Sequence, residues 1–251
     1  MHFRVPRAVS VLSFTVAALS AVLLAQTLGH DPRSVFLLAV LAAILFVPSI
    51  VGRVRMRRLL MSGDVERVIG IWAESMRRVR HPETMTPLLH ATAYAAYGWN
   101  HAARHALDRA AKGAAWDAAI EQRLFIETLL DTFEGDRETA VTKATLLQAL
   151  PIPSAGFLAR RRITALRSGL GALARAFAHA SRVGDDRVLA KAGAASPLVH
   201  WAMRYAEAVV AVDGGSFKKV QELLAQAPEW PAESAFREYH DELIGRTSDL
   251  T

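Results

Sequence analysis

Two long apolar stretches open the chain, at residues 8–28 and 35–51, the second extended by Gly52. They contain 21 and 17 residues, none of them charged, and a six-residue link at 29–34 separates them. A helix needs about 20 largely apolar residues to cross a bilayer, with about 17 as the lower limit. The pattern therefore predicts a transmembrane helical hairpin with spans at about 8–28 and 35–52.

The basic residues that flank these stretches predict an orientation. Arg4 and Arg7 precede the first stretch, and the link carries one arginine against one aspartate. Four arginines close the second stretch: Arg53, Arg55, Arg57 and Arg58. Because Lys and Arg favour the cytoplasmic side, we expect a multi-pass protein of the inner (plasma) membrane with both termini in the cytoplasm. The alternative is that residues 1 to about 28 form a cleaved signal peptide.

After residue 58 the apolar positions recur at spacings of three and four, as in Val65, Val68, Ile69 and Trp72. This periodicity is typical of amphipathic helices, and strand signals are nearly absent. The pattern predicts helices near 53–62, 65–80, 84–97, 99–112, 116–134, 136–150, 155–183, 186–194, 197–213, 216–227 and 232–245. We therefore expect an all-α fold with an anchor at 1–58 and a helical domain at 59–251.

Short turns with glycine and a polar neighbour recur through this domain, at residues 63–64, 98–100, 135–136, 184–185 and 214–216. The first two intervals between them are 35 and 37 residues, and the later ones, 49 and about 31 residues, are less regular. Small or apolar residues follow at five and twelve positions, as Ala103 and Ala110 follow Gly98. A recurring unit of this length indicates stacked helical hairpins.

Residues 94–110, from Tyr94 to Ala110, resemble the second helix of a tetratricopeptide (TPR) repeat. In the first helix before this turn, Pro87, His90 and Ala91 occupy the positions of the family's tryptophan, leucine and glycine. The resemblance implies a TPR-like α-solenoid over 59–251, and a generic helical bundle is the alternative. The overall plan is similar to HemY-type bacterial inner-membrane proteins, which implies an assembly or coupling role without chemistry of its own.

The charge distribution changes the picture that the net charge of +6 suggests. Residues 1–58 contain seven arginines and one aspartate, so they account for the whole excess. Residues 59–251 contain 23 basic and 23 acidic side chains. A nucleic-acid-binding domain usually has a basic excess of its own, so we expect no nucleic-acid partner.

Residues 139–184 contain no Asp or Glu, and four arginines in this stretch step by seven, eight and seven. On one helix they share a face, about 120° from the apolar stripe that Ile163 begins, unless Gly169 and Gly171 break the helix. The row can pair with the acidic helix at 116–134, face anionic lipid, or bind an acidic partner peptide. The candidate partner- or lipid-binding residues are Arg160, Arg161, Arg167, Arg175 and Arg182.

No catalytic motif, phosphate-binding loop or cysteine is present, so we predict no enzymatic activity and no cofactor. His101 and His105 have a spacing that can hold a metal ion, with Asp108 next to them, but the ligand set is incomplete and we predict no metal. The predicted function is a membrane-tethered cytoplasmic adaptor that binds a protein partner through its helical array. The alternative is a non-enzymatic subunit of a membrane complex, whose hairpin packs against other membrane helices.

Overall fold

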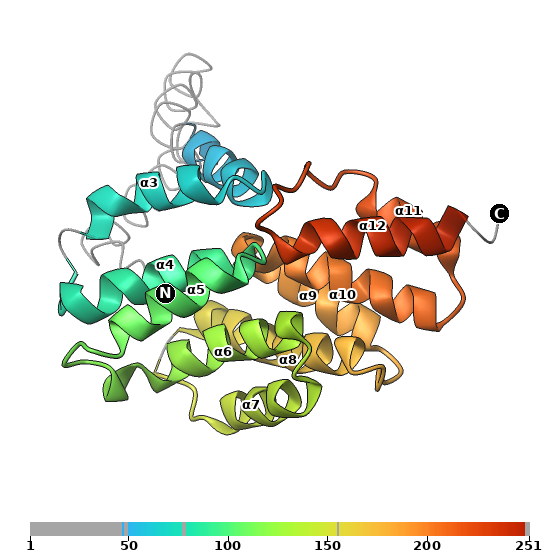
Figure 1. Cartoon of the computed structure of the whole chain (residues 1–251). Coiled ribbons are helices and arrows are strands. Elements are labelled where there is room, and N and C mark those ends of the chain that lie inside the picture. Colours follow the sequence, from blue (N-terminus) through green and yellow to red (C-terminus); the bar gives the residue numbers. More distant parts are fainter. Residues whose placement is uncertain (1–46, 48–49, 77–78, 155, 249–251) are drawn as a thin grey trace, which may run out of the picture. The chain divides into compact units, whose positions relative to one another are not determined.

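The computed structural model describes residue 47 and residues 50–76, 79–154 and 156–248. Every regular element in these ranges is a helix, so the predicted all-α class is confirmed (Figure 1). The chain divides into two compact units, Met1–Arg57 and Arg58–Thr251. The first span of the predicted hairpin and most of the second lie outside the described residues. Within those ranges, none of the helices has the length and apolar character needed to cross a bilayer.

The second unit is built from consecutive helices joined by turns and by longer links, such as the one before α12 (Figure 1). Residues 50–61 are also helical. The helices are α3 (Val65–Met76), α4 (Pro82–Ala96), α5 (Asn100–Ala110), α6 (Ile120–Glu134), α7 (Arg137–Ala149), α8 (Phe157–Phe177), α9 (Asp185–Ala195), α10 (His200–Asp213), α11 (Phe217–Leu224) and α12 (Ala235–Ser248). Two 3₁₀ turns, Asp117–Ala119 and Pro197–Val199, precede α6 and α10.

The helices pack in pairs. α4 packs on α5, α6 on α7, α8 on α9, and α10 on α11, while α4, α6, α8 and α10 also pack on one another in that order. The glycine turns stand between partners, as the sequence predicted. Gly135 ends α6 with a φ of 86°, which favours glycine because it has no Cβ. Ala103 and Ala110 are fully buried in α5, which fits the close approach of α5 and α4.

The helix predicted at 155–183 is shorter than expected. It ends at Phe177 because His179 has a φ of 52°, and the N–H of Ala180 bonds back to the carbonyl of Arg175. Gly169 and Gly171 do not break it. A Cβ on Gly169 would lie 2.2 Å from the Cβ of Ala192, so this glycine lets α8 and α9 approach closely.

The segment before α12 returns to the beginning of the array. The N–H of Ala235 donates to the carbonyl oxygen of Gly98 at 2.9 Å. The hydroxyl of Ser234, which is buried, donates to the carbonyl oxygen of Tyr97 at 2.7 Å. The turn between α4 and α5 is therefore bonded to residues more than 130 positions later in the chain.

Aromatic side chains fix α12 across several helix pairs. Phe236 is fully buried, stacks on Tyr205 of α10 and packs edge-to-face on Phe133 of α6. Tyr239 packs on Phe177 of α8, and its hydroxyl donates to the carbonyl oxygen of Phe133 at 2.9 Å. The first helices of the pairs are thus covered on one side by the chain's own C-terminal segment.

Candidate functional site

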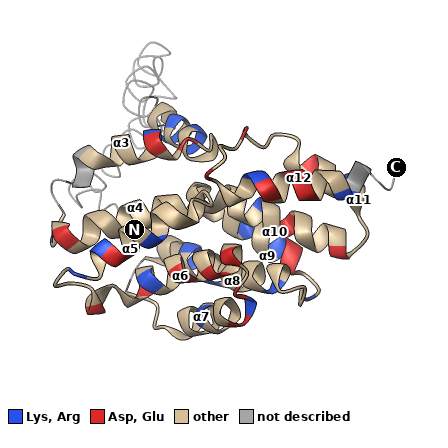
Figure 2. Cartoon of the chain, in the orientation of Figure 1, with Lys and Arg blue, Asp and Glu red and all other residues tan. Residues whose placement is uncertain are grey.

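The predicted arginine row does not form one surface. Arg160 and Arg161 are exposed in the first turns of α8, whereas Arg167 is buried and Arg175 is half-buried further along the helix. Arg182 lies beyond the end of α8, in the exposed link to α9. Figure 2 shows basic residues of α8 in the same part of the molecule as acidic residues of α6.

Arg167 joins three parts of the chain. Its guanidinium donates to Oε1 of Glu121 on α6 from Nη2 at 2.8 Å and from Nε at 3.2 Å. It also donates to the carbonyl oxygens of Leu150 and Pro151, in the link between α7 and α8. The pairing of this row with the acidic helix is therefore confirmed for Arg167. Binding of a partner or lipid by Arg167 stays a prediction, and it requires exchange of these bonds, because the side chain is only 6% exposed.

Arg175 pairs with α9. Its Nη2 and Nε donate to the two carboxylate oxygens of Asp185 at 2.6 and 3.0 Å. The backbone N–H of Arg182 donates to the same carboxylate at 2.9 Å. Burial, the largest single effect, raises the pKa of Asp185, but the bonds from Arg175 and Arg182 outweigh it and the pKa is lowered. Asp185 therefore remains ionised and fixes the turn between the two helices.

The acidic helix α6 is also paired on its other flanks. Asp131 accepts from Arg104 of α5 at 2.7 Å and lies 2.8 Å from Nζ of Lys143 on α7. Arg104 makes further bonds to Glu134, which together with those to Asp131 raise its pKa. These pairs join α5, α6 and α7, so the negative charge of α6 is largely balanced within the array.

Arg160, Arg161 and Arg162 are the basic residues of the acid-free stretch that stay exposed in α8. Their guanidinium groups form no ion pair with any of the described residues. Their positive charge is therefore not balanced by an acid among the described residues. The predicted binding role therefore fits this group best on grounds of access.

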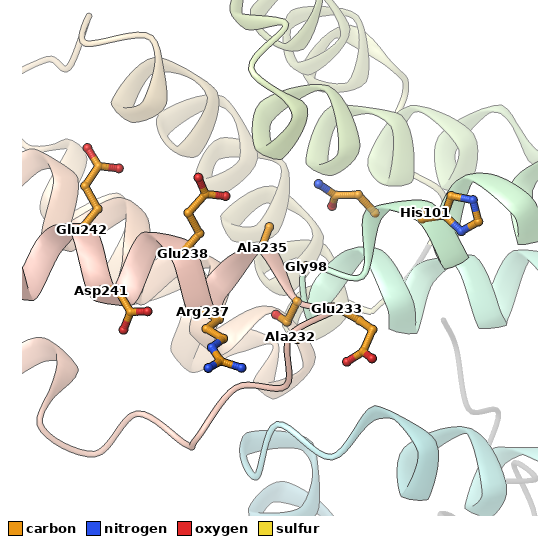
Figure 3. Close-up of a pocket in the computed structure, with 11 residues that line it drawn as sticks. Gly98, His101, Ala232, Glu233, Ala235, Arg237, Glu238, Asp241 and Glu242 are labelled. Atoms are coloured by element: carbon orange, nitrogen blue, oxygen red, sulfur yellow. The ribbon is translucent and has the colours of Figure 1, made fainter.

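A second candidate site was not predicted from the sequence. An open hollow of about 680 Å³ lies between the start of α5, the segment 232–234 and α12. Eleven residues line it: Gly98, Asn100, His101, Ala232, Glu233, Ser234, Ala235, Arg237, Glu238, Asp241 and Glu242. Figure 3 shows Glu238 and Glu242 pointing from α12 in the same direction, with Arg237 and Asp241 on another side of the helix.

The hollow is mainly acidic, with four carboxylates and one guanidinium in its lining. Oδ1 of Asn100, at the start of α5, is buried and accepts no hydrogen bond from a described group. All these side-chain oxygens are hydrogen-bond acceptors, so the hollow suits Lys and Arg side chains of another molecule. The spacing of Glu238, Asp241 and Glu242 on one helix is the only part of this site that the sequence could have indicated. The contribution of α5 becomes visible only in the folded structure.

The two histidines with metal-ligand spacing both lie on α5. His101 and His105 are exposed on α5, and Asp108 is exposed one turn later. Among the residues that the structure describes, no group of three or more His, Asp or Glu side chains is placed to hold a metal ion.

Comparison with known proteins identifies no relative. No family model, no curated protein and no solved structure matches the chain.

Proposed function

We propose that this protein is a membrane-tethered, non-enzymatic adaptor whose TPR-like array binds a basic segment of a partner protein on the cytoplasmic side of the inner membrane. The observation that carries the proposal is the acidic hollow beside α12. It is open to solvent, as a site for a peptide segment must be, and its acidic groups come from two elements that other contacts hold in place.

The arrangement of the helices supports the TPR-like part of the proposal. Four successive pairs, from α4–α5 to α10–α11, stack in order and have glycine turns between partners. Stacked helix pairs of this kind provide extended surfaces for proteins and peptides. In this protein the proposed binding surface is the hollow that lies between the start of α5, the segment 232–234 and α12.

The tether is supported by residues 8–28 and 35–52, which carry no charge and are long enough to span a bilayer. The arginines at both flanks favour a cytoplasmic array. Replacing residues 8–52 with an unrelated membrane hairpin separates this proposal from that of a complex subunit. An adaptor keeps its partner after the exchange, whereas a subunit held by its membrane helices loses it.

A charge exchange tests the site. Glu238 is replaced by a photo-crosslinking residue in the full chain, and crosslinking is carried out in native membranes. The crosslinked product identifies the segment that occupies the hollow. We expect a segment with several Lys or Arg residues, and we expect the E238K/D241K variant to lose binding of the corresponding synthetic peptide. A peptide with its basic residues changed to Glu should bind this variant again.

The matched control is E66K/E222K, which changes two exposed acids of α3 and α11 outside the hollow. It carries the same change in net charge and should bind the original peptide as well as the parent does. Equal loss in both variants indicates a general electrostatic effect and contradicts the proposed site.

A further inference from the structure

The beginning of α8 is largely exposed to solvent. α8 has 21 residues, whereas its neighbours α6, α7 and α10 have 15, 13 and 14. In the first two turns, residues 157–164, all side chains are exposed except Ala159 and Ile163, which are half-buried. At about 1.5 Å per residue, six additional residues extend a helix by about 9 Å. We call residues 157–162 the α8 tip.

Large apolar side chains stand at the end of this tip. Phe157 is 76% exposed and Leu158 is 71% exposed, next to each other in the sequence. Ile152, in the link just before α8, is 37% exposed. Single exposed apolar residues are ordinary, but adjacent large ones at an exposed helix end mark an interaction site.

Basic side chains follow directly. Arg160, Arg161 and Arg162 are exposed and form no ion pair with the described residues, and the nearest acids along the chain are Glu138 and Asp185. A short helical end with apolar residues first and arginines one turn later matches a membrane interface, where apolar groups enter the acyl boundary and basic groups meet phosphates.

We propose that the α8 tip is a second membrane contact of this protein, in which Phe157 and Leu158 enter the interface of a bilayer and Arg160–Arg162 bind anionic lipid headgroups. The inference rests on the membrane tether of the proposed function. It adds that the array itself docks on the lipid surface through a defined element.

Lipid fits the tip better than a second copy of the chain or an acidic protein. A symmetric contact between two tips places two arginine triplets against each other, which is unfavourable. The apolar stretches at 8–28 and 35–52 provide a first attachment to a bilayer, and one weak interfacial element gains strongly when another already holds the chain there. An acidic protein partner accounts for the arginines but leaves the Phe157–Leu158 pair without a matching surface.

A single fluorescent label tests the contact, since the chain contains no cysteine. The L158C variant of the full chain is labelled with an environment-sensitive fluorophore and reconstituted in vesicles that contain lipids with a quencher on the acyl chain. We expect strong quenching in vesicles of phosphatidylcholine with phosphatidylglycerol and little in phosphatidylcholine alone. The control is V183C, an exposed position after the other end of α8, which should not be quenched.

The arginines are tested in the same labelled chain. Changing Arg160, Arg161 and Arg162 to Gln should lower the docked-to-free ratio of the tip on the order of 100-fold, from three lipid-facing charges, and abolish the quenching. Absence of quenching at 158, equal quenching in both vesicle types, or quenching that survives the three substitutions overturns the inference. Burial of the label by a second copy or by an acidic protein, without lipid quenching, overturns it as well.

Flotation of the same vesicles measures the tether separately. If the chain co-floats with phosphatidylcholine vesicles and label 158 is not quenched in either lipid mixture, the tether stands and the tip inference fails. If the chain does not co-float with phosphatidylcholine but label 158 is quenched in vesicles with phosphatidylglycerol, the tether fails and the tip contact stands.

Discussion

The indole Nε1 of Trp201, in α10, donates a 2.7 Å hydrogen bond to the backbone carbonyl oxygen of Met61, 140 positions earlier in the sequence. Trp201 is buried and packs edge-to-face on Trp230, which donates from its own Nε1 to the hydroxyl of Tyr205. The first part of the array and α10 therefore meet through a tryptophan that both packs in the core and donates a hydrogen bond.

Replacement of Trp201 by Phe removes this bond and part of the packing. We expect a loss of about 2 kcal/mol in the free energy of unfolding, measured by urea denaturation. The control is W99F, because Nε1 of Trp99 is buried without an acceptor among the described groups. W99F should be neutral or slightly stabilising, and equal losses in the two variants would contradict the assigned role of the bond to Met61.

Replacement of Arg167 by Met tests the junction of α6, α8 and the link after α7. The change leaves two backbone carbonyls and Glu121 without their donor, and we expect a loss of about 2–3 kcal/mol. R161M removes an exposed arginine from the same helix and should change stability by less than about 0.5 kcal/mol. Thermal unfolding of both variants measures the two losses of stability. Equal losses in R167M and R161M would contradict the stabilising role of Arg167.

Replacement of Gly169 by Ala forces α8 and α9 apart, because the new Cβ meets the Cβ of Ala192. Overpacking of this kind costs about 1–3 kcal/mol. G70A makes the same change in α3 at a position where a Cβ meets nothing within 4 Å, and it should stabilise the chain by about 0.5–1 kcal/mol. The opposite signs are the test, and a stable G169A would show that the two helices separate easily.

Glu207 gives the stability a pH dependence. Burial raises its pKa from 4.5 to about 7, against the lowering effect of Arg204 and Lys219, while Asp186 raises it further. Its side chain is 6% exposed. Below pH 4.5 the carboxyl is protonated in both the folded and the unfolded chain. Between 4.5 and 7 the unfolded chain loses this proton first, so the free energy of unfolding falls as pH rises.

The expected fall is on the order of 3 kcal/mol relative to E207Q, complete near pH 7. It is measured by urea denaturation of both proteins at a series of pH values. E222Q changes an exposed acid of α11 and should follow the parent curve. Parallel curves for the parent and E207Q would show that Glu207 does not titrate in this range.

The sequence predicted the helices well because spacing and glycine turns are local properties. The turns at Gly98 and Gly135 lie where the pattern placed them. The predicted end of α8, at residue 183, was wrong. His179 adopts a left-handed conformation that no local rule requires of histidine. The acidic hollow was missed for a different reason, since α5 and α12 meet there from positions more than 130 residues apart.

The arginine row likewise separates what local spacing predicts from what depends on the packing of distant segments. Its seven- and eight-residue steps left three roles open, and one of them, pairing with the acidic helix at 116–134, is confirmed for Arg167 through Glu121 of α6. They could not show that Arg175 would pair forward with Asp185, or that Arg182 would leave the helix. Pairing depends on which helices become neighbours, and that is decided by packing over the whole array.

The return of residues 228–239 to the first turns has a consequence for biosynthesis. Open repeat arrays can fold one unit at a time as they are synthesised. Here the contacts of Gly98 and Tyr97 are made by Ala235 and Ser234, which leave the ribosome more than 130 positions later. The first helix pair therefore stays partly exposed until residues 228–239 have been translated, and a truncation before residue 228 leaves this pair without its cover.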